Sequence, residues 1–142
     1  MKILAIDYGD ARTGLAVCDK SEFLASPAGV ISEWNTDKLI DKLEAAVKEH
    51  RAELIVLGYP KNMDGSVGER AQKCEKLAEV LKERTGLDVK LWDERRTTVA
   101  AHDILNVTDV RGKKRKQVVD AVAAVRILEG YMAYRKANPD KI

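Results

Sequence analysis

Residues 54–58 read Leu-Ile-Val-Leu-Gly, a run of large apolar side chains closed by a glycine. A strand of this composition has no polar face, which is typical of a parallel strand covered by helices on both sides. Just before it, Leu39, Ile40, Leu43 and Val47 recur at helical spacing and form one apolar stripe. A buried strand next to an amphipathic helix predicts an α/β fold.

Outward from this run, the other segments supply more strands and helices. Three strands near the N-terminus have short connections, which predicts an antiparallel portion, and the later strands follow helices and therefore run parallel. Pro27 interrupts the third strand and favours an edge position. Asn35 is a good helix N-cap, and Gly86 is suited to end a helix. We expect one mixed sheet between helices, in a single domain, with strands at residues 2–6, 15–18, 23–31, 54–58 and 89–93 and helices at 36–50, 71–85, 98–106 and 116–135.

The composition is that of a globular protein. The 142 residues are 45% hydrophobic and 34% charged, and the net charge of +2 is too small to indicate a nucleic-acid partner by itself. Cys18 and Cys74 lie in apolar patterns without a Cys or His cluster, which predicts reduced core residues and no structural zinc. No apolar run approaches the roughly 20 residues of a membrane span, and the chain begins directly with a strand. We expect a cytoplasmic protein with no membrane partner.

Asp120 is the least expected residue of the predicted helix at 116–135. At 100° per residue, the polar side of this helix is centred on Arg126 and Glu129, and Asp120 points the opposite way, beside Ala124. A carboxylate on an apolar face is costly unless it is paired or bound to a cation. Asp120 is therefore either a structural group satisfied by a hydroxyl or amide, or part of a cation site.

Two further acidic positions follow predicted strands. Asp7 ends the first strand, where α/β sheets gather ligands, and Gly9 lets the backbone approach another group closely. Asp7 could also simply cap the turn. Asp93 and Glu94 end the fifth strand, and because neighbours on a strand face opposite ways, at most one of them shares a site with Asp7. The other could pair with Arg95 or Arg96, or cap the helix that follows.

Three carboxylates from two strand ends and a helix suit Mg²⁺ or Mn²⁺, which prefer hard oxygen ligands. Two such ions about 3.5–4 Å apart would activate a water and stabilise the leaving oxygen of a phosphodiester. Residues 113–116 read Lys-Lys-Arg-Lys, which is either a solvated charge run or a holder of a polyanion. Residues 58–66 link a strand to a helix N-terminus; they are either a turn or a phosphate contact, and they lack the spacing of a P-loop.

Four segments together resemble the YqgF family, also called RuvX, which has the RNase H-like fold. They are Asp7-Tyr8-Gly9 with Arg12 and Gly14, residues 58–66 (Gly-Tyr-Pro-Lys-Asn-Met-Asp-Gly-Ser), Asp93-Glu94-Arg95 with Thr97-Thr98, and residues 113–116 with Asp120 to Ala124. The resemblance implies a five-stranded mixed sheet in the order 3-2-1-4-5, with strand 2 antiparallel. It also implies a cytoplasmic, metal-dependent nuclease that matures the 5′ end of pre-16S ribosomal RNA, or a Holliday junction resolvase acting on branched DNA.

The resemblance further implies site residues. The acidic triad, which would also hold Mg²⁺ or Mn²⁺, would be Asp7, Glu94 and Asp120. In the implied sheet order one strand separates Glu94 from Asp7, so their backbones start nearly 10 Å apart at a strand spacing of about 4.8 Å. The residues expected to contact nucleic acid are Arg12, Lys61, Asn62, Arg95, Lys113, Lys114, Arg115 and Lys116. The oligomeric state, monomer or homodimer, is open.

Two other classes of protein fit parts of this pattern. ATP-binding modules of the actin-like and sugar kinase type share the fold and a similar Asp-x-Gly turn, but they need a second half for which 142 residues leave no room. An RNA- or ribosome-binding factor without catalysis is the other alternative. Acidic residues without a metal would make a poor phosphate site, which argues mildly against it.

Overall fold

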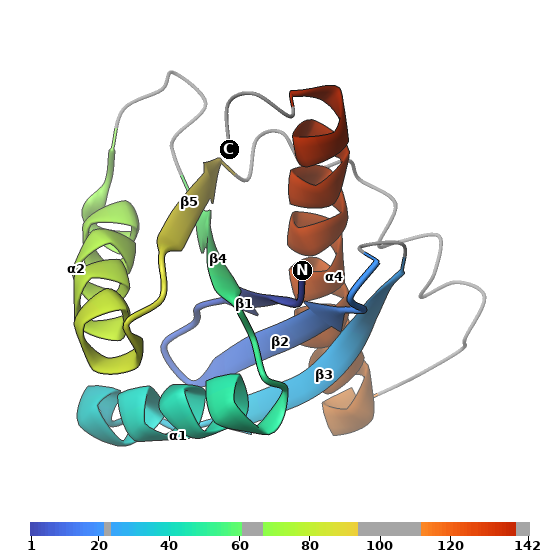
Figure 1. The fold of residues 1–142 in the computed structure, drawn as a ribbon. Coiled ribbons are helices and arrows are strands. Elements are labelled where there is room, and N and C mark those ends of the chain that lie inside the picture. The colour runs from blue at the N-terminus through green and yellow to red at the C-terminus, as the bar shows by residue number, and fades with distance from the viewer. Residues whose placement is uncertain (22–23, 61–66, 94–111, 139–142) are drawn as a thin grey trace.

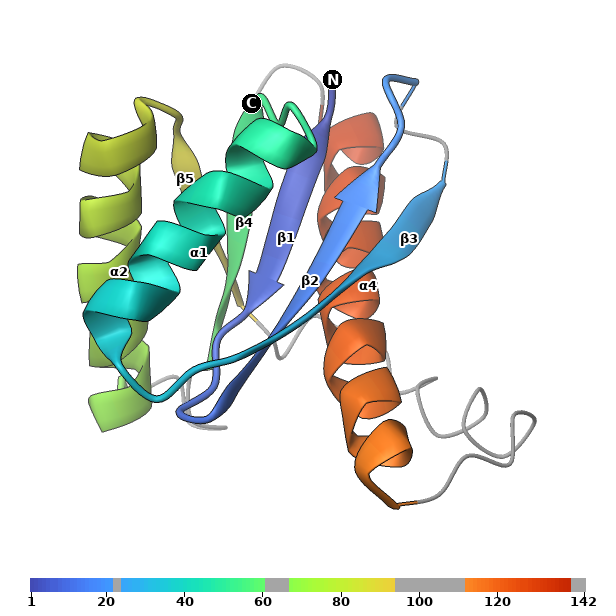
Figure 2. The same cartoon turned by 90° about the horizontal axis from the view of Figure 1, so that it is seen from below.

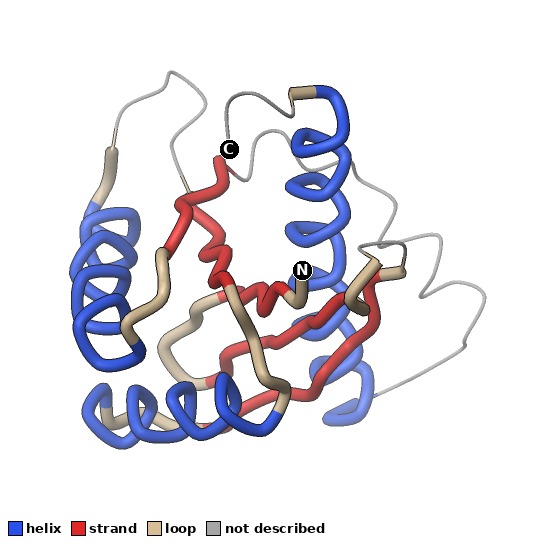
Figure 3. Tube along the Cα trace, viewed as in Figure 1, coloured by secondary structure: helices blue, strands red, loops and turns tan. Residues whose placement is uncertain are grey.

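A mixed sheet with helices on both faces forms the protein (Figure 1). The computed structural model describes residues 1–21, 24–60, 67–93 and 112–138, with only the backbone described over residues 112–120. Figure 3 shows the distribution of helix and strand along the chain. The elements are β1 (Ile3–Asp7), β2 (Arg12–Cys18), β3 (Ala25–Ser32), α1 (Thr36–Glu49), β4 (Leu54–Tyr59), α2 (Glu69–Thr85), β5 (Val89–Asp93) and α4 (Gly112–Ala137).

The strand order is β3-β2-β1-β4-β5, with β1 in the centre. β2 runs antiparallel to both of its neighbours, and β1, β4 and β5 are parallel. This order and these directions confirm the prediction. Because the three parallel strands end at the same edge of the sheet, the last residues of β1, β4 and β5, which are Asp7, Tyr59 and Asp93, lie along one edge.

Two apolar cores lie on opposite faces of the sheet. The side chains of β1 alternate between them: Leu4 and Ile6 belong to the core under α1 and α2, and Ile3 and Ala5 belong to the core under α4. Figure 2 shows α1 and α2 on one side of the sheet and α4 on the other. All four of these β1 side chains are fully buried, which explains why the strand has no polar position before Asp7.

The ends of the elements follow the predicted local rules. The side chain of Asn35 accepts a hydrogen bond from the backbone N–H of Lys38 at 3.0 Å and caps α1. Gly86 ends α2 in the left-handed conformation, with φ 73°. β3 is an edge strand, as Pro27 predicts, and its register with β2 shifts beside Ala28, where Gly29 has φ 117°.

The start of α4 corrects one prediction. The helix begins at Gly112 rather than at Lys116, so residues 113–115 are part of it and do not precede it. The sequence indicated a later start because the dense run of Val, Ala, Leu and Ile begins only after Lys116; the first turn of the helix has no acidic residue, and cations there oppose the helix dipole. Lysine and arginine are nevertheless good helix formers, so the helix continues through them. The predicted helix at 98–106 lies outside the described residues.

None of the helices within the described ranges is long and apolar enough to cross a membrane.

Candidate active site at the carboxyl edge of the sheet

Asp7 occupies the end of the central strand and is half-buried. It follows Ile3 and Ala5 at the strand repeat of two, so it lies on the α4 face of the sheet. Gly14 of β2 is its register partner, and Arg12, two residues before Gly14, lies on the same face. The structure therefore brings one expected acidic residue and one expected cation to the same face and the same edge.

The loop after Asp7 is tightly folded on itself. A Cβ atom added to Gly9 would clash with the backbone carbonyl oxygen of Arg12. The fully buried Thr13 donates a hydrogen bond from its hydroxyl to the carbonyl of Gly9 at 3.5 Å. The close approach expected at Gly9 thus occurs, and the group approached belongs to the same loop. This packing fixes the direction in which the chain leaves Asp7.

Two cations of α2 contact the same loop. Arg70 donates from Nη2 to the carbonyl oxygen of Tyr8 at 3.0 Å, and Nζ of Lys73 lies 3.8 Å from Oδ1 of Asp10. Sequence reasoning did not identify these residues. Their spacing could have identified them. Arg70, Lys73 and Lys76 are three residues apart and therefore share one face of the helix that follows the 58–66 loop, a candidate phosphate contact.

Asp93 and Asp7 lie on opposite faces of the sheet. Trp92, the residue before Asp93, is buried in the α4 core, and its ring packs on Tyr131 and Tyr134 at centroid distances of 5.9 Å and 5.8 Å. Because side chains alternate along a strand, Asp93 lies on the face of α1 and α2. The sheet therefore separates the side chain of Asp93 from that of Asp7. Glu94 and Arg95 lie outside the described residues.

Tyr59, at the end of β4, has a structural role. Its side chain is buried, and its hydroxyl donates a hydrogen bond to Oε1 of Glu75 on α2. This hydrogen bond, together with burial, raises the pKa of Tyr59 to about 12. At the start of the 58–66 loop, the hydroxyl of Tyr59 is therefore hydrogen-bonded to α2. Lys61 and Asn62, further along this loop, lie outside the described residues.

Asp120 belongs to α4, the helix that covers the face on which Asp7 lies. The side chains of α4 are described from residue 121 onward. On its inward face, Ala121 is 9% exposed and Ala124 is 0% exposed. The side chains of Asp120 and of residues 113–116 lie outside what the structure describes. Among the described side chains, no group of three or more His, Cys, Asp or Glu residues could hold a metal ion. Asp7 is the one expected metal ligand whose side chain is described.

A five-stranded mixed sheet in the order 3-2-1-4-5 with helices on both faces defines an RNase H-like fold. Solved structures agree: RuvC of Thermus thermophilus in complex with a Holliday junction matches with a TM-score of 0.59 at 11% identity, over 94% of this chain and 96% of that one. The fowlpox virus Holliday junction resolvase matches with a TM-score of 0.57 at 12% identity, over 94% and 99%. At these identities the likeness concerns the fold.

The chain belongs to the RuvX family, whose model, described as Holliday junction resolvase, matches residues 1–134. A relative from Desulfitobacterium hafniense is 44% identical over 94% of this chain and 93% of its own length, and one from Clostridium novyi is 41% identical over 93% and 98%. Both carry the name "Putative pre-16S rRNA nuclease". Family membership places the chain among hydrolases of phosphodiester bonds.

Proposed function

We propose that this protein is a divalent-cation-dependent nuclease that trims the 5′ end of pre-16S ribosomal RNA. The observation that carries the proposal is the position of Asp7, a half-buried carboxylate at the end of the central strand, on the face that α4 covers. The names of relatives that are more than 40% identical over nearly the whole chain support RNA as the substrate.

The proposed acidic set is Asp7, Glu94 and Asp120. We assign Glu94 rather than Asp93 to it because Asp93 lies on the opposite face from Asp7. One strand, β4, separates β5 from β1, so the strand that Glu94 follows in the sequence is not adjacent to the strand that carries Asp7. Asp120 is assigned because α4 packs on β1 and β2, the strands that carry Asp7 and Arg12.

The donor set consists of carboxylates only, which fits Mg²⁺ or Mn²⁺ and excludes ions that prefer sulfur or imidazole. A divalent cation held there supplies polarisation of the phosphate and activation of water. Asp7 and Asp120 would hold the cation, and Glu94 would either complete its ligands or accept a proton from the attacking water. A carboxylate serves as a base when it is within hydrogen-bond reach of that proton.

The cations have the role of holding the phosphate backbone. Arg12 shares a face with Asp7 and would contact the phosphate nearest the cut. Residues 113–116 occupy the N-terminal turns of α4, where free backbone N–H groups also favour anions. The remaining proposed contacts are Lys61, Asn62 and Arg95. Each phosphate contact that is lost should lower the slope of log K against log salt by about 1.

A cleavage assay on two substrates tests the proposal. A pre-16S RNA fragment with its 5′ extension and a four-way DNA junction are incubated with wild type, Asp7→Asn and Asp93→Asn, with Mg²⁺ or with EDTA. Asp93→Asn is the matched control because it makes the same chemical change at the same edge of the sheet, on the opposite face. Circular dichroism confirms that each variant is folded.

The expected result is Mg²⁺-dependent shortening of the RNA by wild type and Asp93→Asn, and no cleavage by Asp7→Asn. Cleavage of the junction alone would instead assign the resolvase activity that the family description names. Equal cleavage by folded Asp7→Asn and wild type would refute the site. Tight RNA binding that survives EDTA, with no cleavage of either substrate, would indicate a binding factor.

A further inference from the structure

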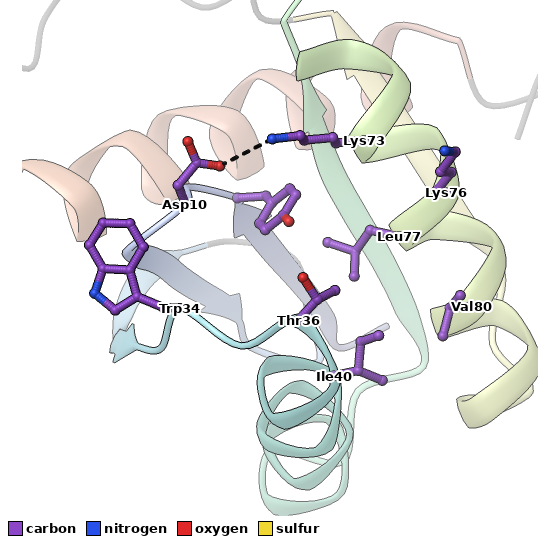
Figure 4. A pocket seen from close by; sticks show the side chains of 9 residues that line it. Asp10, Trp34, Thr36, Ile40, Lys73, Lys76, Leu77 and Val80 are labelled. Atoms are coloured by element: carbon purple, nitrogen blue, oxygen red, sulfur yellow. Dashed lines mark ion pairs between the residues drawn. The ribbon is translucent and has the colours of Figure 1, made fainter. Parts of the chain in front are cut away.

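A pocket of about 470 Å³ opens on the face of the sheet opposite α4 (Figure 4). Its walls come from the loop after β1, the start of α1 and one side of α2. The lining residues from the loop are Tyr8 and Asp10, and the one from the start of α1 is Thr36. The volume is in the range of small-ligand pockets. Asp7, the one residue of the proposed acidic set whose side chain is described, does not line it, so the pocket needs a separate explanation.

The lining is apolar inside and aromatic at the rim. Ile40 and Leu77 are buried and belong to the core under α1 and α2, and Val80 packs against that core. Trp34 lines the pocket, and 78% of its surface is exposed to solvent. Packing within the described part of the chain therefore does not explain why so large an apolar side chain stands at this position. An exposed indole beside an apolar slot offers a flat surface on which another planar ring can stack.

The charges at the rim favour an anion. Lys73 and Lys76 of α2 line the pocket together with one carboxylate, that of Asp10. In Figure 4, Trp34 and Lys76 lie on opposite sides of the pocket, and Lys73 points toward Asp10. The ion pair between Lys73 and Asp10 spans 3.8 Å, and both side chains are about half exposed, so it is weak and can yield to a phosphate. A planar ring attached to a phosphate, that is a nucleotide, matches this combination.

The pocket is joined to the proposed catalytic carboxylate by a short loop. Asp7 and Asp10 are three residues apart, so their Cα atoms are separated by at most about 11 Å. The loop turns around the carboxyl edge of the sheet, from the α4 face at Asp7 to the opposite face at the pocket. Its course is held by Arg70 through the carbonyl of Tyr8. A nucleic-acid strand lying over this loop can reach both places at once.

We propose that this pocket binds one unpaired base of the substrate strand, stacked on Trp34, with an adjoining phosphate at Lys73 and Lys76. The inference rests on the proposed function for the identity of the substrate and goes beyond it by specifying a base-binding subsite on the other face of the sheet. A base that is paired in a duplex cannot enter the slot. The pocket therefore selects single-stranded RNA next to the bond that is cut.

The test measures binding without cleavage. All proteins carry Asp7→Asn and are kept in EDTA, and the probes are an octaadenylate RNA and a blunt RNA duplex of the same length. Trp34→Ala should weaken binding of the single strand by about 5- to 150-fold, the range given by the stacking of one base. Duplex binding should change less than twofold. Lys76→Ala should weaken single-strand binding more than Lys82→Ala, which removes the same charge from an exposed position near the end of α2.

Tryptophan fluorescence gives a second readout. The single strand should quench the emission of the parent protein and leave that of Trp34→Phe unchanged, because the remaining Trp92 is only 6% exposed. Single-strand affinity of Trp34→Ala within twofold of the parent would overturn the inference and leave the pocket to a protein partner. This failure differs from failure of the nuclease proposal, which is decided by cleavage with intact Asp7. Weakened binding by Trp34→Ala would support the subsite even if no cleavage were found.

Discussion

Alanine at Gly130 tests how tightly α4 is packed on the end of β5. A Cβ atom at this position would lie 3.1 Å from Cζ2 and 3.2 Å from Nε1 of Trp92, closer than ordinary van der Waals contact. The indole is 6% exposed, and its ring packs on Tyr131 and Tyr134, so it has little freedom to move away. We therefore expect the added methyl group to strain the interface.

Two opposing effects set the magnitude. Replacing glycine by alanine inside a helix gains about 1 kcal/mol of helix propensity. Adding a methyl group to a filled core loses about 1–3 kcal/mol. The loss exceeds the gain by about 0–2 kcal/mol, so Gly130→Ala should destabilise the protein by about 1 kcal/mol, the middle of that range. In a Trp92→Phe background the smaller ring leaves room for the methyl group, and the same change should become stabilising by about 1 kcal/mol.

Urea denaturation of the four proteins, followed by circular dichroism, gives the coupling free energy between the two positions. The expected coupling is about 2 kcal/mol, within the range for residues in contact. The cycle cancels the separate effect of Trp92→Phe. A stabilising effect of Gly130→Ala in both backgrounds, with coupling below about 0.5 kcal/mol, would contradict tight packing of the indole on this helix.

Three further changes test other parts of the fold. Gly9→Ala should destabilise the protein by about 1–3 kcal/mol, the range for a methyl group added to filled space, because the new Cβ meets the backbone carbonyl of Arg12; urea midpoints measure this. The pKa of Tyr59 is raised from 10.0 to about 12 by Glu75, so the folded state keeps a proton that the unfolded state loses. Wild type should therefore lose stability as the pH rises from 10 to 12, and Tyr59→Phe should lack this part of the loss in urea titrations at each pH. Asn35→Ala should lower the unfolding free energy by about 1 kcal/mol, measured in the same way, through loss of the α1 cap.

The fold was largely predictable because local signals and burial agree. The apolar run of β4 predicted a parallel strand covered on both faces, Pro27 predicted the edge, and Asn35 and Gly86 predicted helix ends. The predicted start of α4 was wrong because the apolar run begins only after Lys116, whereas a long helix packed on a sheet can also include the cations before it, although they oppose its dipole.

The site was less predictable because its shape depends on contacts between distant residues. Asp7 was identified from its place after a strand, but Arg70 contacts the Asp7 loop across 62 positions of sequence. Tyr59 stood in a candidate substrate loop, and its role became clear only when Glu75 was found beside it. The pocket beside Trp34 depends on how the loop after β1, α1 and α2 come together, which periodicity does not specify. The roles of Asp7, Glu94 and Asp120 stay predictions.

The late position of α4 in the chain has a consequence for synthesis. One whole face of the sheet, including Ile3, Ala5, Ala16 and Val56, is covered by this helix, whose residues are translated after all five strands. During vectorial synthesis that face stays apolar and exposed until α4 leaves the ribosome, so the emerging chain is a candidate client for chaperones. If Asp120 is catalytic, the enzyme also cannot become active before α4 has been translated. The nuclease would thereby stay inactive until this helix has been made and has packed on the sheet.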